Sequence, residues 1–212
     1  MKFLGAYLIG NVMGGQVVGR LRGGVDLSKL GSGNIGATNA LRTQGKLFAL
    51  AVLLIDVFKG VCAALFVPAV AWEWAGGTHW PREWQAYLCG VAVTLGHCYP
   101  FFYRFKGGKG VATLAGVFGT LLTPALPWLL LAFALTVMLT GYASLATLSA
   151  STTALLYIGF VDMRGFTSAA GAFTVTMCVL VAWKHRENIL RLLQGKESRF
   201  EKARVLRRWR RR

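Results

Sequence analysis

The sequence GHCYPFFYRFKGGKGVAT, residues 96–113, decides how the rest of the chain is interpreted. An apolar run leads into Pro100, and then Arg104, Lys106 and Lys109 are interspersed with three glycines before a second apolar run begins. Glycine backbone can turn successive N–H groups toward one point, and a helix start leaves its first N–H groups unpaired. The stretch therefore indicates a site for phosphate or another oxyanion between two apolar segments.

Composition indicates a membrane protein. Of 212 residues, 55% are hydrophobic and 15% are charged, and the mean hydropathy is +0.50. The net charge is +16, and half of the 24 Lys and Arg residues follow residue 183. Most of the others lie in loops between apolar segments, which retention of cationic loops in the cytoplasm explains better than nucleic-acid binding. We expect membrane lipids as partners and no nucleic acid.

The apolar segments predict an all-α integral membrane protein with about seven transmembrane helices. They are residues 3–19, 47–71, 85–101, 111–123, 125–142, 144–161 and 166–183. The charge rule puts the N-terminus outside and the C-terminus in the cytoplasm, with the active site in cytoplasmic loops. Gly116 and Gly119 in the short fourth segment predict close helix packing.

The chain is expected to have two parts, and the same charge rule gives three cytoplasmic polar stretches. One membrane domain is expected over residues 1–201, followed by a basic cytoplasmic tail over residues 202–212. The tryptophan-rich connection at residues 72–84 suits the opposite interface. The polar stretches are the first loop (residues 31–46), the glycine loop (residues 102–110) and the third stretch (residues 184–200).

The first loop, which begins GSGNIGATNALR, has three glycines in six residues, a pattern that favours a backbone nest over a regular helix. Ser32 and Asn34 supply small donors and acceptors. Thr38 and Arg42 have the i,i+4 spacing that would place them on one face of a following short helix. An ordinary connecting loop, with Arg42 at the lipid headgroups, remains the alternative.

Several polar residues within or beside the apolar segments have two interpretations at this stage. The glycine loop lacks the Ser or Thr of a Walker A motif, so it is either an anion site or a cationic topology loop. His97 is either a packing residue or a residue with a chemical role. Asp56 and Lys59, one turn apart in an apolar segment, are either functional or an ion pair between packed helices.

The third stretch has the apolar spacing of a short interfacial helix. His185, Asn188, Arg191 (or Leu192) and Gly195 follow one another in steps of three or four, so one helix face could present His185 and Asn188. A membrane-surface helix with a solvated cationic face is the alternative.

Neither a metal nor another cofactor is expected. The four cysteines lie singly in apolar segments, and no His, Cys or carboxylate cluster has the spacing of metal ligands. Two non-enzymatic classes compete with an enzyme. A transporter of a phosphate-bearing solute would need polar residues along its spans and ideally an inverted repeat, whereas the basic tail alone supports a lipid-binding scaffold.

Three motifs together resemble those of the bacterial acyl-phosphate-dependent glycerol-3-phosphate acyltransferases, the PlsY family. They are GSGNIGATN at residues 31–39, the stretch at residues 96–113, and N-I-x-R-L-x-x-G-x-E at residues 188–197. The resemblance implies a multi-pass enzyme of the bacterial inner membrane that transfers a fatty acyl group from long-chain acyl phosphate to the 1-hydroxyl of glycerol 3-phosphate. Lysophosphatidic acid and phosphate would be the products, in the first step of phospholipid synthesis.

The resemblance also implies roles for individual residues, which we carry over as hypotheses. Catalytic roles fall on Ser32, Arg42, Lys106 and His185. Substrate binding falls on Gly33, Asn34, Thr38, Asn39, His97, Gly107, Gly108, Lys109, Gly110, Thr113, Asn188 and Arg191. Because acyl phosphate is an activated mixed anhydride, positioning and charge stabilisation can suffice for the reaction.

Overall fold

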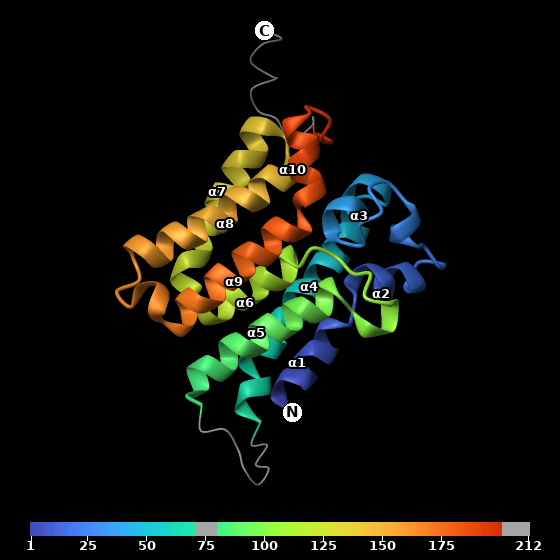
Figure 1. Ribbon diagram of the computed structural model, residues 1–212. Helices are drawn as coiled ribbons and strands as arrows, with labels where there is room; N and C mark the ends of the chain where they lie inside the picture. The colour runs from blue at the N-terminus through green and yellow to red at the C-terminus, as the bar shows by residue number, and fades with distance from the viewer. Residues whose placement is uncertain (71–79, 201–212) are drawn as a thin grey trace. The chain divides into compact units, whose positions relative to one another are not determined.

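The computed structural model describes residues 1–70 and 80–200, and all regular structure in these ranges is helical (Figure 1). The predicted basic tail, residues 202–212, lies outside the described residues, as does most of the predicted tryptophan-rich connection, residues 72–84. The chain forms two compact units, Met1–Leu122 and Thr123–Arg212. The predicted all-α class is confirmed.

The first unit is built around its longest helix, α4, against which five other helices pack. The helices are α1 (Lys2–Gly10), α2 (Gly14–Leu21), α3 (Ala37–Thr43), α4 (Lys46–Leu65), α5 (Arg82–Cys98) and α6 (Val111–Leu121). Single 3-10 turns also occur, at η1 (Leu27–Lys29), η2 (Val67–Ala69) and η3 (Phe101–Tyr103).

The first apolar segment is interrupted, which its composition did not predict. One span was expected over residues 3–19, but α1 ends at Gly10 and α2 begins at Gly14. A helix of nine residues rises only about 14 Å, roughly half of the hydrocarbon core. The backbone between the two helices must therefore find hydrogen-bond partners elsewhere.

A buried ion pair on α4 supplies these partners. Lys59 Nζ donates to the carbonyl oxygens of Gly10 at 3.1 Å and Val12 at 2.7 Å, and lies 2.9 Å from Asp56 Oδ1. The same Asp56 oxygen accepts from the N–H of Gly14, the first residue of α2, at 3.2 Å. Both side chains are buried. The ion-pair interpretation of Asp56 and Lys59 is thus confirmed, and the pair replaces backbone hydrogen bonds lost at the break.

Glycines let the helices of this unit cross with backbones in contact. A Cβ on Gly96 of α5 would lie 2.1 Å from the carbonyl oxygen of Tyr7 on α1. A Cβ on Gly116 of α6 would lie 2.1 Å from the carbonyl oxygen of Val57 on α4. The close packing predicted for Gly116 is confirmed.

The second unit contains α7 (Leu126–Thr140), α8 (Ala143–Phe160), α9 (Ala169–Lys184) and α10 (Arg186–Leu193). Two 3-10 turns, η4 (Thr123–Ala125) and η5 (Gly165–Thr167), precede α7 and α9. Gly141, with φ of +79°, makes the left-handed turn between α7 and α8.

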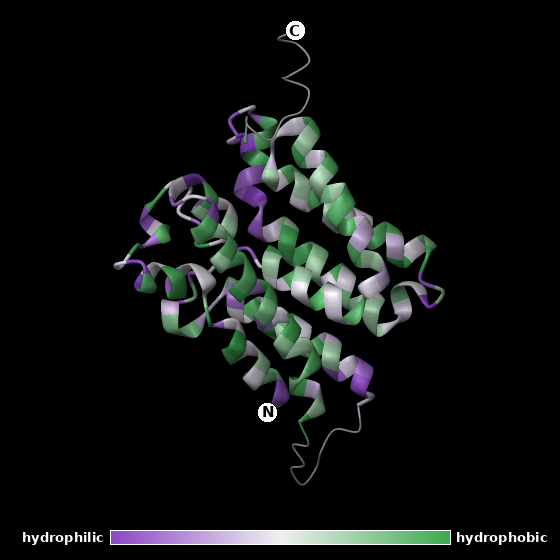
Figure 2. Ribbon diagram, turned by 180° about the vertical axis from the view of Figure 1, so that it is seen from behind, coloured by the Kyte–Doolittle hydropathy of each residue, from purple (hydrophilic) through white to green (hydrophobic). Residues whose placement is uncertain are grey.

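In Figure 2 apolar colour follows the long helices, and hydrophilic colour gathers at connections and near α10.

Among the described residues, three helical segments are long and apolar enough to cross a membrane by themselves: Lys46–Ala69, Thr123–Thr140 and Ala143–Phe160. Val111–Leu121 and Ala169–Lys184 are shorter apolar helices. These segments are compatible with about seven crossings in total. The orientation of the chain ends stays a prediction.

Replacing Lys59 by methionine tests the role of the ion pair. The change keeps a long side chain but leaves Asp56 and two backbone carbonyls without the ammonium. We expect the free energy of unfolding to fall by about 3–5 kcal/mol, seen as a lower Tm in detergent. The neighbouring Phe58→Leu, at a side chain that is 66% exposed, should change it by less than about 0.5 kcal/mol. Equal Tm values for Lys59→Met and wild type would contradict this role.

Candidate functional site

Asn39 holds the first loop in shape. Its Oδ1 accepts from the N–H of Ser32 at 3.0 Å, and its Nδ2 donates to the carbonyl oxygens of Leu27 and Leu30 at 3.2 and 2.9 Å. A Cβ on Gly31, where φ is +55°, would lie 2.4 Å from Asn39 Oδ1. Asn39 is buried and its amide is engaged by the loop, so the structure favours a positioning role for this residue over substrate contact.

The other residues predicted in the first loop face outward or lie near the surface. Ser32, Gly33, Thr38 and Arg42 are exposed, and Asn34 is half-buried. Thr38 and Arg42 lie one turn apart on α3, as their spacing predicted. The loop therefore presents a hydroxyl and a guanidinium group on a backbone that Asn39 fixes.

An apolar cluster brings the first loop beside the glycine loop. Leu27, Ile35 and Ala40 are buried in it together with Phe48 of α4, and Tyr103 of η3 packs against the same cluster. Since Tyr103 lies three residues before Lys106, the two loops are neighbours in this unit (Figure 1).

The glycine loop reverses direction tightly before α6. Arg104 and Phe105 have φ of 52° and 59°, values that are uncommon for residues other than glycine. The exposed Lys106 and the half-buried Lys109 follow. Gly110, at φ +81°, then precedes α6, whose N-terminus has no side-chain cap. The uncapped N–H groups and the two lysines make this loop suited to an anion.

His97 at the end of α5 holds Gly107 and Gly108 of the glycine loop. Its carbonyl oxygen accepts from the N–H of Gly108 at 3.1 Å. A Cβ on Gly107 would lie 2.1 Å from this oxygen, and a Cβ on Gly108 would lie 2.1 Å from His97 Nε2. The Gly108 N–H is thus engaged within the protein, which removes this one N–H from the predicted nest.

Two residues predicted to bind substrate are buried. His97 is 3% exposed, and its Nδ1 lies 2.7 Å from Lys59 Nζ. Thr113 is 0% exposed, its backbone packs on Gly60 of α4, and its hydroxyl has no hydrogen-bond partner among the described residues. Their positions favour supporting roles behind the loop.

In the second unit, two of the predicted residues of the third stretch, Asn188 and Arg191, contact Glu197. Asn188 Nδ2 donates to Glu197 Oε1 at 2.7 Å, and Arg191 Nε donates to Oε2 at 2.8 Å. Ser144 Oγ on α8 also donates to Oε1, at 2.9 Å. Burial alone would raise the pKa of Glu197, but the hydrogen bonds from Arg191, Asn188 and Ser144 outweigh it and hold the pKa below its ordinary value.

His185 lies between α9 and α10 and is buried. Its Nδ1 is 2.8 Å from the carbonyl oxygen of Val181. A carbonyl can only accept, so Nδ1 carries the proton and Nε2 is the basic nitrogen. The helix predicted for the third stretch is confirmed as α10, and His185 and Asn188 are both buried at its start.

Sequence reasoning assigned no role to Ser144 or Glu197 in the site. Ser144 sits in the small-residue run of α8, and its partner Glu197 is 53 positions away. No local spacing connects these residues. The sequence signal that could have identified Glu197 was its place in the third motif.

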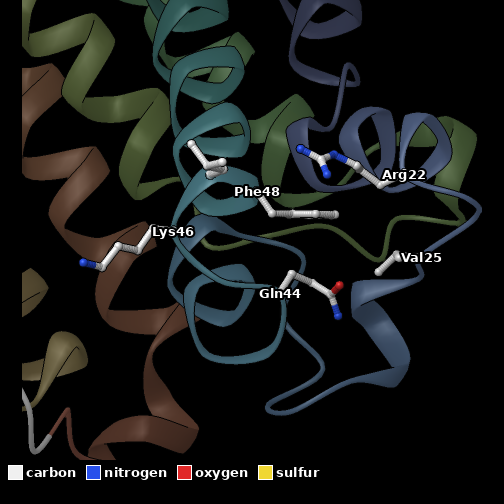
Figure 3. A pocket seen from close by; sticks show the side chains of 6 residues that line it. Arg22, Val25, Gln44, Lys46 and Phe48 are labelled. Atoms are coloured by element: carbon white, nitrogen blue, oxygen red, sulfur yellow. The ribbon is translucent and has the colours of Figure 1, made fainter.

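A cavity of about 560 Å³ lies beside α3 and α4, but the predicted site residues do not line it. Its described lining is Arg22, Val25, Gln44, Lys46, Leu47 and Phe48. Figure 3 shows Arg22 and Gln44 on either side of Phe48, with Lys46 directed away from both. Because its two cations do not converge, this cavity is not the anion site that the sequence predicts.

An all-helical chain with apolar spans and a cationic, glycine-rich anion loop is an integral membrane protein suited to phosphorylated molecules. Residues 1–195 match the model of one protein family, described as glycerol-3-phosphate acyltransferase. The match covers most of the chain, including nearly all of the three motifs. The chain therefore belongs to the glycerol-3-phosphate acyltransferase family, and the resemblance seen in the motifs is confirmed.

Curated relatives and solved structures agree. The glycerol-3-phosphate acyltransferase of Aquifex aeolicus (strain VF5) is 37% identical over 195 residues, covering 92% of this chain and 95% of that protein. That of Paraburkholderia phytofirmans is 41% identical over 204 residues, covering 92% and 87%.

The crystal structure of PlsY (YgiH), an integral membrane glycerol 3-phosphate acyltransferase, in its glycerol 3-phosphate form, has a TM-score of 0.80 and is 34% identical. The alignment covers 97% of this chain and 96% of that chain. The lysophosphatidic acid form of PlsY has a TM-score of 0.79.

Glu197→Gln tests the carboxylate at the third stretch. Because the pKa of Glu197 is lowered in the folded protein, its stabilising effect is present above the ordinary value of 4.5 and is lost as the pH falls below it. We expect Glu197→Gln to lower the free energy of unfolding by about 1.5–3 kcal/mol near pH 7, with a smaller difference from wild type near pH 4.

The matched control is Glu187→Gln, since Glu187 also approaches Arg191, at 3.9 Å, but its side chain is 72% exposed. Thermal unfolding in detergent should place this variant within about 0.5 kcal/mol of wild type at both pH values. Equal losses of stability from Glu197→Gln and Glu187→Gln would show that the buried carboxylate contributes no more to stability than the exposed one.

Proposed function

We propose that this protein transfers a fatty acyl group from long-chain acyl phosphate to the 1-hydroxyl of glycerol 3-phosphate, in the inner membrane of a bacterium. The observation that carries the proposal is the match over 97% of the chain to a PlsY structure in the glycerol 3-phosphate form. The acyl-phosphate donor is supported by the three motifs, and a multi-pass membrane chain gives the fatty chain access to lipid.

The reaction needs little beyond positioning and charge. The glycerol hydroxyl attacks the acyl carbon, a new ester C–O bond forms, and the bond from the acyl carbon to the phosphate oxygen breaks. Phosphate leaves, and the hydroxyl proton passes either to it or to a base. Because phosphate is a good leaving group, oriented cations and N–H groups can supply most of the stabilisation of the transition state.

The cations of the first unit are suited to the acyl phosphate. Arg42 and Lys106 are exposed on neighbouring loops, and Ser32 is exposed beside a backbone that Asn39 holds. We assign these three side chains to the acyl phosphate and the developing oxyanion, with the backbone of Gly107 and Gly110. Gly108 shapes the loop through its bond to His97.

In the first unit, Thr38 and Lys109 are assigned to phosphate binding. In the second unit, His185 and Asn188 are assigned to binding glycerol 3-phosphate. Gly33, Asn34 and Arg191 are assigned to supporting contacts with substrate. His185 is the candidate base, because its Nδ1 faces the Val181 carbonyl and leaves Nε2 as the basic nitrogen. Asn39, His97 and Thr113 are assigned to holding these groups in place.

Phosphate release from palmitoyl phosphate and glycerol 3-phosphate by purified protein tests the reaction. Wild type should release phosphate only when both substrates are present, and lysophosphatidic acid should appear in equal amount. Lys106→Ala should lower kcat about 10²–10³-fold, as loss of one donor to an oxyanion does.

The control for Lys106→Ala is Lys29→Ala, since Lys29 is a highly exposed lysine whose nearby charged partner is Asp26, at 3.8 Å. Its kcat and KM should equal those of wild type. Full activity of Lys106→Ala would remove that lysine from the chemistry, and no turnover by wild type would contradict the reaction itself.

His185→Ala distinguishes the two proton acceptors. If His185 is the base, kcat falls about 10²–10⁴-fold and the acid limb of the pH–rate profile disappears. If phosphate takes the proton, the profile keeps its shape. A full-rate His185→Ala variant would exclude this histidine as the base.

A further inference from the structure

A group of three buried polar side chains lies behind the glycine loop and contributes no side chain to the proposed chemistry. Asp56 and Lys59 lie on α4, and His97 lies at the end of α5. Their exposed fractions are 1%, 4% and 3%. Polar groups at such depth in a membrane protein are costly unless they are fully partnered, so their partners indicate what they do.

The group is fixed at one end by backbone. Lys59 Nζ donates to the carbonyl oxygens of Gly10 and Val12, and Asp56 Oδ1 accepts from the N–H of Gly14. These three backbone groups border the break between α1 and α2, and a break within a packed unit has little freedom to move. The ammonium of Lys59 is therefore held at a defined point.

His97 connects this fixed point to the loop. Its Nδ1 is 2.7 Å from Lys59 Nζ and 3.5 Å from Asp56 Oδ1. Nδ1 therefore lies against both members of the ion pair, which fixes the orientation of the ring. A Cβ on Gly108 would lie 2.1 Å from Nε2, so this side of the ring faces the loop.

We propose that Asp56, Lys59 and His97 form a positioning unit for the glycine loop. The ion pair orients the imidazole, and the imidazole and carbonyl of His97 hold Gly107 and Gly108 against the end of α5. The position of Lys109 and of the uncapped N-terminus of α6 follows from that contact. This inference rests on the proposed function, in which the glycine loop binds a phosphorylated substrate.

The side chain of His97 allows a test that leaves the helix break intact. Without the imidazole, Lys59 keeps its contacts with Asp56, Gly10 and Val12. His97→Ala therefore removes the contact with the loop and spares the backbone bonds at the break. His97→Asn keeps a polar group near the position of Nδ1 but lacks the part of the ring that faces Gly108.

The experiment measures kcat and the KM of both substrates for these two variants, together with Tm and the folded fraction in detergent. We expect His97→Ala to raise the KM of at least one phosphorylated substrate about tenfold. His97→Asn should recover part of that loss. Leu95→Ala on α5, at a side chain that is 36% exposed, is the control and should leave both KM values unchanged.

A merely structural role predicts another outcome. Partial unfolding would lower the maximal rate in proportion to the folded fraction and leave both KM values equal to those of wild type. That result for His97→Ala would overturn the proposal, and so would an unchanged rate and KM.

A double substitution tests the contact itself. Gly108→Ala alone forces a methyl group against His97 Nε2, whereas in the His97→Ala background that space is open. We expect the double variant to have a KM no higher than that of the worse single variant, since both changes disturb one contact. If the two substitutions raised KM by factors that multiply in the double variant, the proposed contact would be contradicted.

Binding of glycerol 3-phosphate, measured by calorimetry on the same variants, separates this proposal from the proposed reaction. If wild type binds glycerol 3-phosphate but does not turn over, the proposed reaction fails. The binding comparison still decides the positioning role. An approximately tenfold higher Kd for His97→Ala supports it, and an unchanged Kd together with unchanged KM values overturns it.

Discussion

The ammonium group of Lys59, donating to two carbonyl oxygens where the first helix stops, is the interaction on which the first unit depends. Without a donor at this depth, residues 11–13 would have to continue the helix, because lipid offers no hydrogen bonds. With it, α1 can end at Gly10 and cross α5 closely at Gly96. The same ammonium contacts His97, so one side chain links a helix break to the loop before α6.

The polar loops depend on buried amides and carboxylates in a similar way. Asn39 uses its whole side-chain amide to fix the first loop, and Glu197 uses both carboxylate oxygens to fix Asn188 and Arg191. In each case a buried polar side chain satisfies hydrogen-bonding groups of a segment rich in glycine or cations. Exposed side chains, such as those of Ser32 and Lys106, therefore project from backbone whose conformation is fixed.

The features that the sequence predicted correctly depend on patterns of residues close together in the chain. The apolar blocks predicted the helices of the second unit, the spacing of Thr38 and Arg42 predicted α3, and the three motifs predicted the family. Because glycine has no side chain, Gly116 predicted that two helices pack closely there. Each of these depends on residues a few positions apart, so a single sequence contains the information.

The features that it missed depend on partners far along the chain. The break after Gly10 has no proline, and its hydrogen-bond partner Lys59 is 49 positions away. The resemblance assigned His97 to substrate binding, whereas its burial against Lys59 depends on the packing of α4 against α5. Thr113 was also assigned to substrate, and its burial against Gly60 depends on the crossing of α4 and α6.

The position of a bound phosphorylated substrate tests the central claim most directly. A structure of this protein with glycerol 3-phosphate or an acyl-phosphate analogue should place a phosphate at the N-terminus of α6, within hydrogen-bond distance of loop backbone after Gly108. The contacts from Lys59 to His97 and from His97 to Gly108 should remain in place. Phosphates bound only away from residues 106–113, or a glycine loop displaced from His97 in the complex, would contradict the account.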